Sequence, residues 1–192
     1  MNLDNKILNS AFAIYSNHPQ LQSLFLFLAS DLIYILVILV LVFWFVRTNR
    51  EFIRKGLVEA FICFVIARGM LTTLIRDFFP RERPHVADHL FYFTAAKASE
   101  PSFPSGHASA MFAIAMTLYF YNRKLGLTLL ILSVLTGIFR VVVGYHYPSD
   151  IVGGAVLGII VAFLTHAYLQ KFSGALSKNV SIWSDKLLPF TK

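Results

Sequence analysis

Three short polar segments interrupt an otherwise apolar sequence, and each combines residue types that bind or transfer phosphate. They are residues 76–84 (RDFFPRERP), 104–107 (PSGH) and 140–150 (RVVVGYHYPSD). An arginine presents a planar fork of donors that matches phosphate oxygens, and it keeps its charge at any physiological pH. The segments contain three arginines that we expect to converge, namely Arg76, Arg83 and Arg140. This set predicts a binding site for a tetrahedral anion.

The second segment adds backbone donors to this predicted site. Ser105 and Gly106 stand where a helix is expected to begin. Free N–H groups and the positive end of the helix dipole bind anions at such a position. Glycine at 106 lets the backbone come close to a ligand. We therefore expect both residues to bind phosphate together with the arginines.

Two histidines, His107 and His146, can supply the chemistry of phosphoryl transfer. One histidine attacks phosphorus while the other protonates the leaving oxygen. Asp150 follows His146 by four residues, across the Tyr147–Pro148 turn. From there its carboxylate can hold the far ring nitrogen and keep the attacking nitrogen unprotonated. Together these residues predict a catalytic site with a nucleophile, its orienting acid and a proton donor.

The elements that position these segments are predicted to be membrane-spanning helices. The chain has 192 residues, of which 57% are apolar and 14% charged, against roughly 45–50% and 25% in soluble domains. This composition excludes a disordered chain, and the single cysteine, Cys63, excludes a disulfide scaffold. We predict one all-α domain over residues 1–192, an integral membrane helical bundle.

The apolar runs define five spans and two flanking segments. A spanning helix needs about 20 mostly apolar residues. The predicted spans are residues 21–46, 57–79, 105–121, 125–144 and 149–170. Residues 2–16 show apolar side chains at helical spacing, which predicts an amphipathic helix on the membrane surface. Residues 171–192 are predicted to be a tail with a weaker amphipathic pattern.

The distribution of basic residues predicts the orientation of the chain in the membrane. The spans place all three polar segments and the N-terminus on one face. The opposite face carries ten basic residues: Arg47, Arg50, Arg54, Lys55, Arg123, Lys124, Lys171, Lys178, Lys186 and Lys192. Cytoplasmic loops are enriched in Lys and Arg. We therefore predict an inner or plasma membrane protein with an outward-facing site and a cytoplasmic C-terminus. The net charge of +7 then reflects topology and an anion site, and no nucleic acid partner is expected.

The three segments resemble the signature of the type 2 phosphatidic acid phosphatase superfamily. Its pattern is a basic residue, six residues and Arg-Pro; then Pro-Ser-Gly-His; then Ser-Arg, five residues, His, three residues and Asp. The resemblance implies that His146 is the nucleophile, forming a phosphohistidine, that Asp150 is its partner and that His107 is the acid. It implies five phosphate ligands: Arg76, Arg83, Ser105, Gly106 and Arg140. It also implies that neither a metal nor another cofactor is needed.

Within this superfamily the chain is most similar to bacterial undecaprenyl-diphosphatases of the bacitracin-resistance type. The likeness rests on the short chain and on the GYHYPSD stretch. Such enzymes convert undecaprenyl diphosphate to the monophosphate, so that the carrier is reused in cell wall synthesis. Three positions depart from the patterns: Arg76 replaces the usual Lys, Phe139 replaces Ser, and Gly106 stands where the bacitracin-resistance branch often has Asp. Phosphatidylglycerophosphate, phosphatidate and lipid A phosphates stay open as alternative substrates.

Other polar residues have simpler interpretations. His18, His85, His89 and His166 lack motif spacing and are expected to be interfacial or packing residues, and Arg81 is expected to be an interfacial anchor. Charges inside spans usually face protein or water. A different class of function, a proton-coupled transporter, would line its path with the intramembrane residues Asp31, Glu59, Arg68 and His166. The partners expected are a lipid phosphate or diphosphate and membrane lipids, and the sequence leaves the oligomeric state open.

Overall fold

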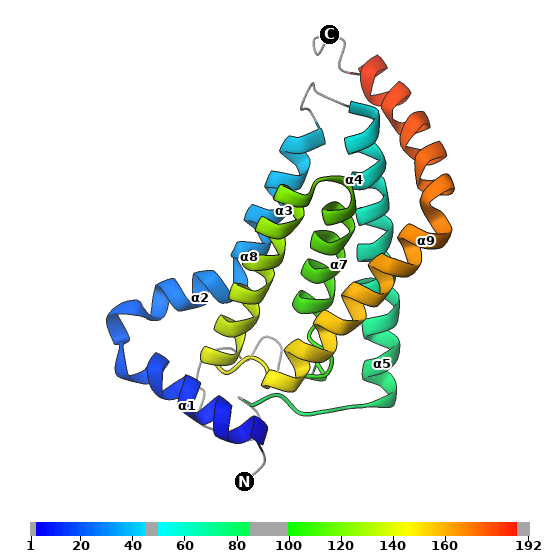
Figure 1. Ribbon diagram of the computed structural model, residues 1–192. Coiled ribbons are helices and arrows are strands. Elements are labelled where there is room, and N and C mark those ends of the chain that lie inside the picture. The colour runs from blue at the N-terminus through cyan, green and yellow to red at the C-terminus, as the bar shows by residue number, and fades with distance from the viewer. Residues whose placement is uncertain (1–2, 45–49, 85–99, 188–192) are drawn as a thin grey trace.

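The fold is all-helical, as the sequence predicts. The computed structural model describes residues 3–44, 50–84 and 100–187, and every regular element in these ranges is a helix. The helices are α1 (Leu3–Asn17), η1 (Pro19–Leu21), α2 (Gln22–Ser30), α3 (Leu32–Trp44), α4 (Arg50–Phe64), η2 (Val65–Leu71), α5 (Thr72–Phe78), α7 (Gly106–Tyr121), α8 (Arg123–Val142) and α9 (Pro148–Leu187). Figure 1 shows the long helices side by side, with α1 and α2 crossing one end of the bundle.

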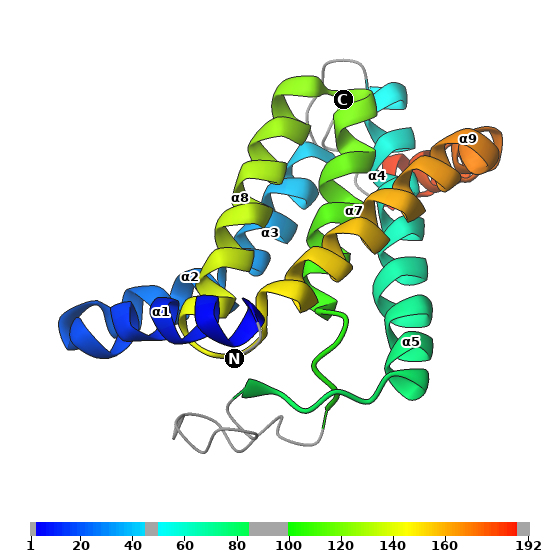
Figure 2. The ribbon, with the colours of Figure 1, turned by 60° about the horizontal axis from the view of Figure 1, so that its bottom comes forward.

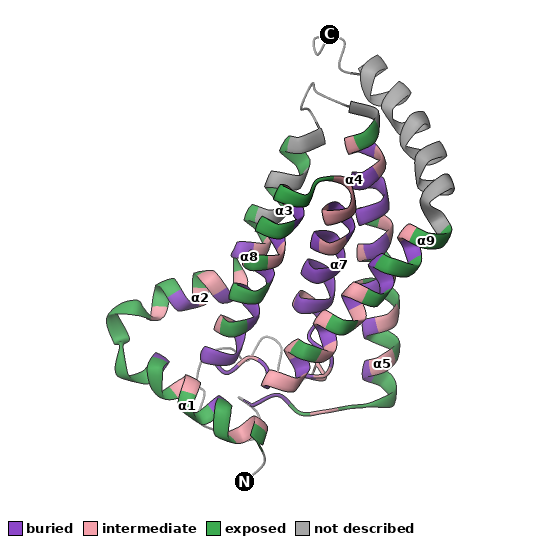
Figure 3. Cartoon of the chain, viewed as in Figure 1, coloured by how far each residue is buried: buried purple, intermediate pink, exposed green. Residues whose placement is uncertain are grey.

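Helix α7 is the centre of the bundle. It packs against α4, α8 and α9, and its described residues are buried on nearly every side, as Figure 3 shows. The helix is rich in small side chains, which let neighbouring helices come close without leaving voids. A helix buried all round needs no polar face. The segment that carries Ser105, Gly106 and His107 therefore leads into a closely packed helix.

Two glycines of α9 create its close approach to α7. A Cβ at Gly154 would lie 2.6 Å from the carbonyl oxygen of Ser105, and one at Gly158 would lie 2.5 Å from that of Ser109. Both atoms belong to the backbone and cannot swing aside. This contact brings the start of α9 to the start of α7.

Three helices in the described residues are long and apolar enough to cross a membrane: Phe52–Phe78, Arg123–Val142 and Pro148–Tyr168. They correspond to the second, fourth and fifth predicted spans. Helix α7 has 16 residues, and α3 has 13 up to the point where the described residues end. Large apolar side chains along these helices, such as Ile131, Ile138 and Val152, are exposed on the outside of the bundle. A lipid environment suits such a surface.

The prediction of one continuous helix over residues 21–46 is wrong. The run breaks at Asp31, and α2 turns away from α3 across the end of α8 (Figures 1 and 2). The cause is tertiary packing, because Phe25 and Ala29 of α2 are buried against Val142 and Val143. Asp31 stays exposed at the break and forms the last backbone bond of α2, from its N–H to Phe27.

Helix α1 forms where predicted, but it is held by the bundle rather than only by a membrane surface. Leu8 is completely buried and packs with Val141 and Tyr147, while Tyr15 packs with Phe25. Leu3 and Ile7 remain exposed. The apolar stripe of α1 thus covers the end of α8 and the first residues of α9.

The fifth predicted span, residues 149–170, corresponds to the apolar stretch Pro148–Tyr168, but the helix does not end with this stretch. Helix α9 is one helix of 40 residues that continues to Leu187, through most of the predicted tail. No proline interrupts residues 149–187, and Pro189 follows shortly after the end of the helix. The predicted histidines His85 and His89 lie outside the described residues.

Replacing Gly158 with alanine should lower the thermal stability of the protein. Its Cβ would press on backbone atoms of α7, and overpacking of this kind costs about 1–3 kcal/mol. We expect Tm in detergent to fall by roughly 2–12 °C. Gly69→Ala is the matched control, because a Cβ there meets nothing within 4 Å. Equal Tm shifts in the two variants would contradict the packing argument.

Candidate functional site

The turn before α9 fixes the orientation of Asp150. Pro148 is the first residue of α9, a position that suits its fixed φ and missing N–H. The backbone N–H of Tyr147, just before the helix, donates to Asp150 Oδ2 at 2.9 Å. This reciprocal bond is one half of a capping box. Gly144 adopts a positive φ of 74°, which lets the chain leave α8 and reverse toward His146.

A serine stands between His146 and Asp150. Ser102 Oγ donates to Asp150 Oδ2 at 2.5 Å and lies 3.2 Å from His146 Nδ1, while Nδ1 and Oδ2 are 3.5 Å apart. Since the carboxylate is only an acceptor, the hydroxyl proton goes to Asp150, and Ser102 Oγ accepts the proton of Nδ1. The other ring nitrogen, Nε2, then carries a lone pair.

Burial keeps this imidazole neutral. His146 is 1% exposed, and burial lowers the pKa of its ring to about 3, with Arg140 and Arg83 adding to the effect while Asp150 opposes it. A neutral ring with its proton on Nδ1 is the form that can act as a nucleophile through Nε2.

Arg81 is part of the site, whereas the sequence predicts only an interfacial anchor. Its Nη1 donates to Asp150 Oδ1 at 2.8 Å and to Ser149 Oγ at 2.7 Å. Its Nη2 donates to Asp4 Oδ2 at 2.9 Å, and its guanidinium lies 3.8 Å from the centre of the Tyr147 ring. The side chain therefore joins the orienting acid to the N-terminal helix.

Asp4 of α1 caps α9 from outside that helix. Its carboxylate accepts from the backbone N–H of Ser149 at 3.1 Å and from Ser149 Oγ at 2.5 Å. Burial raises the pKa of Asp4, but the hydrogen bonds from Ser149 and Arg81 outweigh it and hold the pKa below its usual value. A carboxylate at a helix N-terminus satisfies a free donor and complements the dipole.

The predicted arginines Arg76, Arg83 and Arg140 are buried at the same end of the bundle. Arg76 and Arg83 both contact the carboxylate of Glu100, each at 3.3 Å from Oε2, and Arg76 also donates to the carbonyl of Pro104. Burial lowers the pKa of Arg83, and the charges of Glu100 and Asp150 oppose that change. Glu100 is thus a negative group already held by two of the three arginines.

Two polar atoms at this cluster are buried with no hydrogen-bond partner in the described residues: Ser105 Oγ and Arg140 Nε. Ser105 precedes α7, and its N–H donates to the carbonyl of Asp150, which joins the starts of α7 and α9. Another nitrogen of Arg140, Nη1, donates to the carbonyl of Ala29. Buried polar groups without a partner are costly, so a ligand that supplies acceptors to these atoms is favoured here.

The structure therefore brings the predicted site residues to one end of the bundle. His107 lies in the first turn of α7, directly after Gly106, and is partly exposed. Sequence reasoning missed Ser102, Glu100, Asp4 and the role of Arg81. Ser102 and Glu100 immediately precede the PSGH segment, which is the one signal that points to them. A single acid on an amphipathic helix gives no such signal for Asp4.

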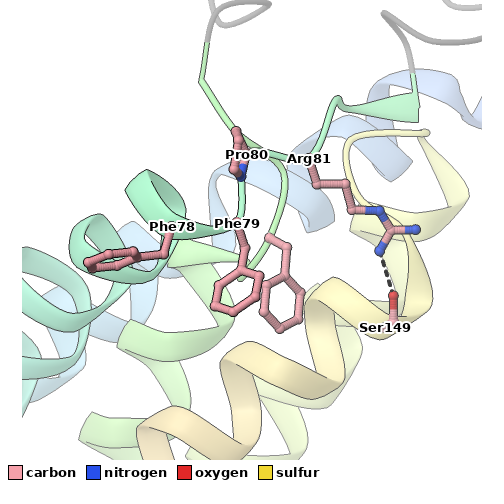
Figure 4. A pocket seen from close by; sticks show the side chains of 6 residues that line it. Phe78, Phe79, Pro80, Arg81 and Ser149 are labelled. Carbon is pink, nitrogen blue, oxygen red and sulfur yellow. Dashed lines mark hydrogen bonds between the residues drawn. The ribbon is translucent and has the colours of Figure 1, made fainter.

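A pocket of about 490 Å³ opens beside these residues (Figure 4). Its walls are mostly aromatic and its polar groups are few. The lining residues are Phe78, Phe79, Pro80, Arg81, Phe103 and Ser149. In Figure 4, the bond from Arg81 to Ser149 closes one side of it. An apolar pocket that meets a polar cluster fits an amphiphilic ligand.

A second polar cluster lies toward the other end of the bundle. Glu59 is completely buried, accepts a hydrogen bond from Tyr121 and has its Oε1 3.1 Å from His166 Nδ1. His166 also stacks on Phe120, with ring centres 4.2 Å apart. This pairing explains how Glu59 is accommodated in an apolar helix.

Comparison with known proteins gives a consistent result. Residues 56–173 match the PAP2 superfamily. The chain is 32% identical over 162 residues to undecaprenyl-diphosphatase BcrC of Bacillus subtilis, covering 84% of this chain and 82% of that one. It is 28% identical to the bacitracin transport permease protein BcrC of Bacillus licheniformis, covering 81% and 75%. A transmembrane PAP2 type phosphatidylglycerolphosphate phosphatase from B. subtilis superposes with a TM-score of 0.60 at 22% identity, covering 88% and 85%.

The depressed pKa of His146 should make the stability of the folded protein depend on pH. Unfolded histidine titrates near 6.5 and folded His146 near 3, so the unfolded state binds an extra proton between these values. The contribution of His146 is complete above pH 6.5 and is lost as the pH falls toward 3, by about 1.4 kcal/mol per pH unit. His146→Gln should therefore show a smaller fall in Tm than the wild type between pH 7 and 4.

The control for this measurement is His18→Gln, because His18 is exposed. It should keep the pH dependence of the wild type. If His146→Gln and the wild type lose Tm in parallel over this range, His146 is not held neutral by the fold.

Proposed function

This chain belongs to the PAP2 superfamily and is a membrane lipid phosphatase, and on that basis we propose that it hydrolyses undecaprenyl diphosphate to undecaprenyl phosphate. One observation in particular supports a phosphate-binding role for this site. Ser105 Oγ and Arg140 Nε are buried donors without partners in the described residues, beside Arg76 and Arg83. A phosphoryl group supplies the missing acceptors. The similarity to undecaprenyl-diphosphatase BcrC over most of both chains supports the choice of lipid.

The first step uses His146 as the nucleophile. Its Nε2 attacks the terminal phosphorus, a P–N bond forms, and the bond from phosphorus to the bridging oxygen breaks. His107 gives a proton to the departing oxygen, which leaves with the lipid phosphate. Asp150, through Ser102, stabilises the positive charge that develops on the ring.

The second step regenerates the enzyme. His107, now neutral, takes a proton from water, the water oxygen attacks phosphorus, and the P–N bond breaks to release orthophosphate. Arg76, Arg83 and Arg140, with Ser105 Oγ and the N–H of Gly106, bind the equatorial oxygens in both steps. Arginines thus take the charge-neutralising role that a metal has in other phosphatases, and the proposal needs no cofactor.

Glu100 has a defined place in this cycle. Its carboxylate contacts the same two guanidinium groups that the phosphoryl group needs, Arg76 and Arg83. The side chain is 44% exposed and both contacts are 3.3 Å long, so the ion pairs are weak ones. A phosphate with two charges displaces the carboxylate when it binds.

The aromatic pocket suits the lipid part of the substrate. Phe78, Phe79 and Phe103 line it next to Arg81. The pocket opens beside the phosphate cluster, by which we mean Arg76, Arg83, Arg140 and Ser105. Phe78 and Phe79 lie at the end of the membrane helix α5 and are largely exposed. A polyprenyl chain that enters from the bilayer past these rings brings its diphosphate to the cluster.

We propose that the site faces away from the cytoplasm. Helices α4 and α8 begin at the end of the bundle opposite the site (Figure 1), and Lys55, Arg123 and Lys124 belong to the first two turns of these helices. Basic residues accumulate on the cytoplasmic side of membrane proteins. The C-terminus is then cytoplasmic and the dephosphorylation takes place at the outer leaflet.

A transporter is a weaker explanation of the same chain. It would collect Asp31, Glu59, Arg68 and His166 along one path. Glu59 and His166 instead contact each other, while Asp31 is exposed at the break between α2 and α3. These residues form separate local environments.

A substrate panel tests the proposed lipid directly. Undecaprenyl diphosphate should give the highest kcat/KM, by at least about tenfold, over phosphatidylglycerophosphate, phosphatidate and lipid A phosphate, because only it combines a diphosphate with a polyprenyl chain. The products should be orthophosphate and undecaprenyl phosphate, and His146→Gln serves as the inactive control. A clear preference for one of the other three lipids would contradict the assignment.

The covalent step predicts different behaviour for the two histidine variants. His107→Gln should still accumulate labelled phosphoenzyme from a terminally labelled diphosphate, because lipid phosphate is a good leaving group, and it should release the label slowly. His146→Gln should take up no label. The measurement is the amount of label bound to the protein after the reaction is stopped at alkaline pH, because phosphohistidine is stable in alkali and is lost in acid. Equal labelling of His146→Gln and wild type would rule out His146 as the nucleophile.

A further inference from the structure

Arg68 is a fourth arginine at the phosphate cluster, outside the three motif segments. It belongs to η2 and is half-buried within the second membrane helix. A Cβ at Gly106 would lie 2.5 Å from Arg68 Nε and 2.9 Å from its Cζ. The guanidinium therefore rests directly against the first residue of α7, and its charge acts on Arg76, Arg83 and Arg140.

The position of Arg68 is unfavourable unless an anion binds there. Among the residues that the structure describes, no hydrogen bond or ion pair to Arg68 is present. A charged side chain within a membrane span normally finds a partner. Here it also stands at the positive end of the α7 dipole, where a cation is repelled and an anion is stabilised.

The π-helical turn explains why Arg68 points to the site. In an α-helix, side chains seven apart share a face, whereas Arg68 and Arg76 are eight apart. The wide turn of η2 absorbs one residue, and the N–H and Oγ1 of Thr72 both bond to the carbonyl of Ala67 to close it. The bulge thereby brings Arg68 to the side of the helix that faces the start of α7.

The charges of the cluster match a diphosphate better than a monophosphate. Arg68, Arg76, Arg83 and Arg140 contribute four positive charges, against one from Glu100, while Asp150 is paired with Arg81. A monophosphate carries about two negative charges near neutral pH and a diphosphate about three. The additional cation lies beside Gly106, directly before the proposed proton donor His107. This is the side of the cluster from which the leaving group departs.

We propose that Arg68 binds the lipid-linked phosphate of a diphosphate substrate and so selects diphosphates over monophosphates. This inference rests on the proposed function, in which the terminal phosphate is the one transferred to His146. Arg76, Arg83 and Arg140 hold that terminal phosphate, and Arg68 holds the phosphate that leaves. The second phosphate subsite is thus formed by the bulged turn of the second membrane helix and the N-terminus of α7.

The test compares Arg68→Gln with wild type, as full-length protein in detergent, on farnesyl diphosphate and farnesyl monophosphate. Because Arg68→Gln removes a charge-assisted hydrogen bond to the substrate, kcat/KM for the diphosphate should fall by about 10- to 100-fold. The value for the monophosphate should change by less than about threefold. Arg68→Lys keeps the charge without the planar fork and should lose less on the diphosphate. Arg123→Gln, exposed at the far end of the bundle, is the control and should match wild type on both substrates.

Inhibition separates this inference from the choice of physiological lipid. With farnesyl monophosphate as the assay substrate, the inhibition constant of pyrophosphate should rise about tenfold or more in Arg68→Gln, and that of orthophosphate should barely change. This comparison decides the role of Arg68 even if wild type turns over no diphosphate, a result that would overturn the proposed function alone.

Equal losses on both farnesyl substrates would place Arg68 at the reacting phosphate and overturn the inference, as would no loss on either. If Arg68→Gln does not fold, the loss of kcat/KM on the diphosphate is compared with the loss on the monophosphate for Arg68→Lys, and this comparison tests the inference. A selective loss on the diphosphate supports the second subsite, and an unselective one excludes it.

Discussion

The site depends on one buried carboxylate and its donors. Asp150 has no exposure to solvent, so each of its oxygens must be satisfied by the protein. Its donors come from three parts of the chain, namely Ser102 before α7, the N–H of Tyr147 and Arg81 after α5, and the ring of His146 is joined to it through Ser102. A displacement of any one of these segments removes a hydrogen bond from a buried charge. This constraint holds together segments that are far apart in sequence.

The network around Asp150 extends to the N-terminal helix. Arg81 donates to two carboxylates, Asp150 and Asp4. The same carboxylate caps α9 at Ser149. Helix α1 is thus attached to the bundle by an ionic contact at Asp4 and an apolar contact at Leu8, one helical turn later.

The sequence predicts that the three polar segments converge, but it does not predict where the helices around them bend and end. Arg76, Ser105 and His146 could be placed together because each lies at the end of an apolar run, and the ends of spanning helices meet at a membrane face. The break at Asp31 was not predictable from periodicity, since α2 and α3 are both apolar and α2 turns because α8 offers a surface to Phe25 and Ala29. Tertiary packing overrides local preference at such a position. The π turn at Arg68 is equally invisible, because one absorbed residue leaves the hydropathy of the helix unchanged.

An anion site at a membrane interface faces opposing demands, and the arrangement of the arginines shows how this chain meets them. Several guanidinium groups must lie close together to bind phosphate strongly, yet in low-dielectric surroundings they repel one another. Hydrogen bonds to backbone carbonyls, from Arg76 to Pro104 and from Arg140 to Ala29, orient these groups without neutralising them. Glu100 provides a partial counter-charge from a solvent-accessible position, where exchange for a ligand requires little desolvation. If the carboxylate at position 100 were buried as deeply as Asp150, it would hold the arginines more tightly in the free protein. The affinity of the arginines for phosphate would then be lower.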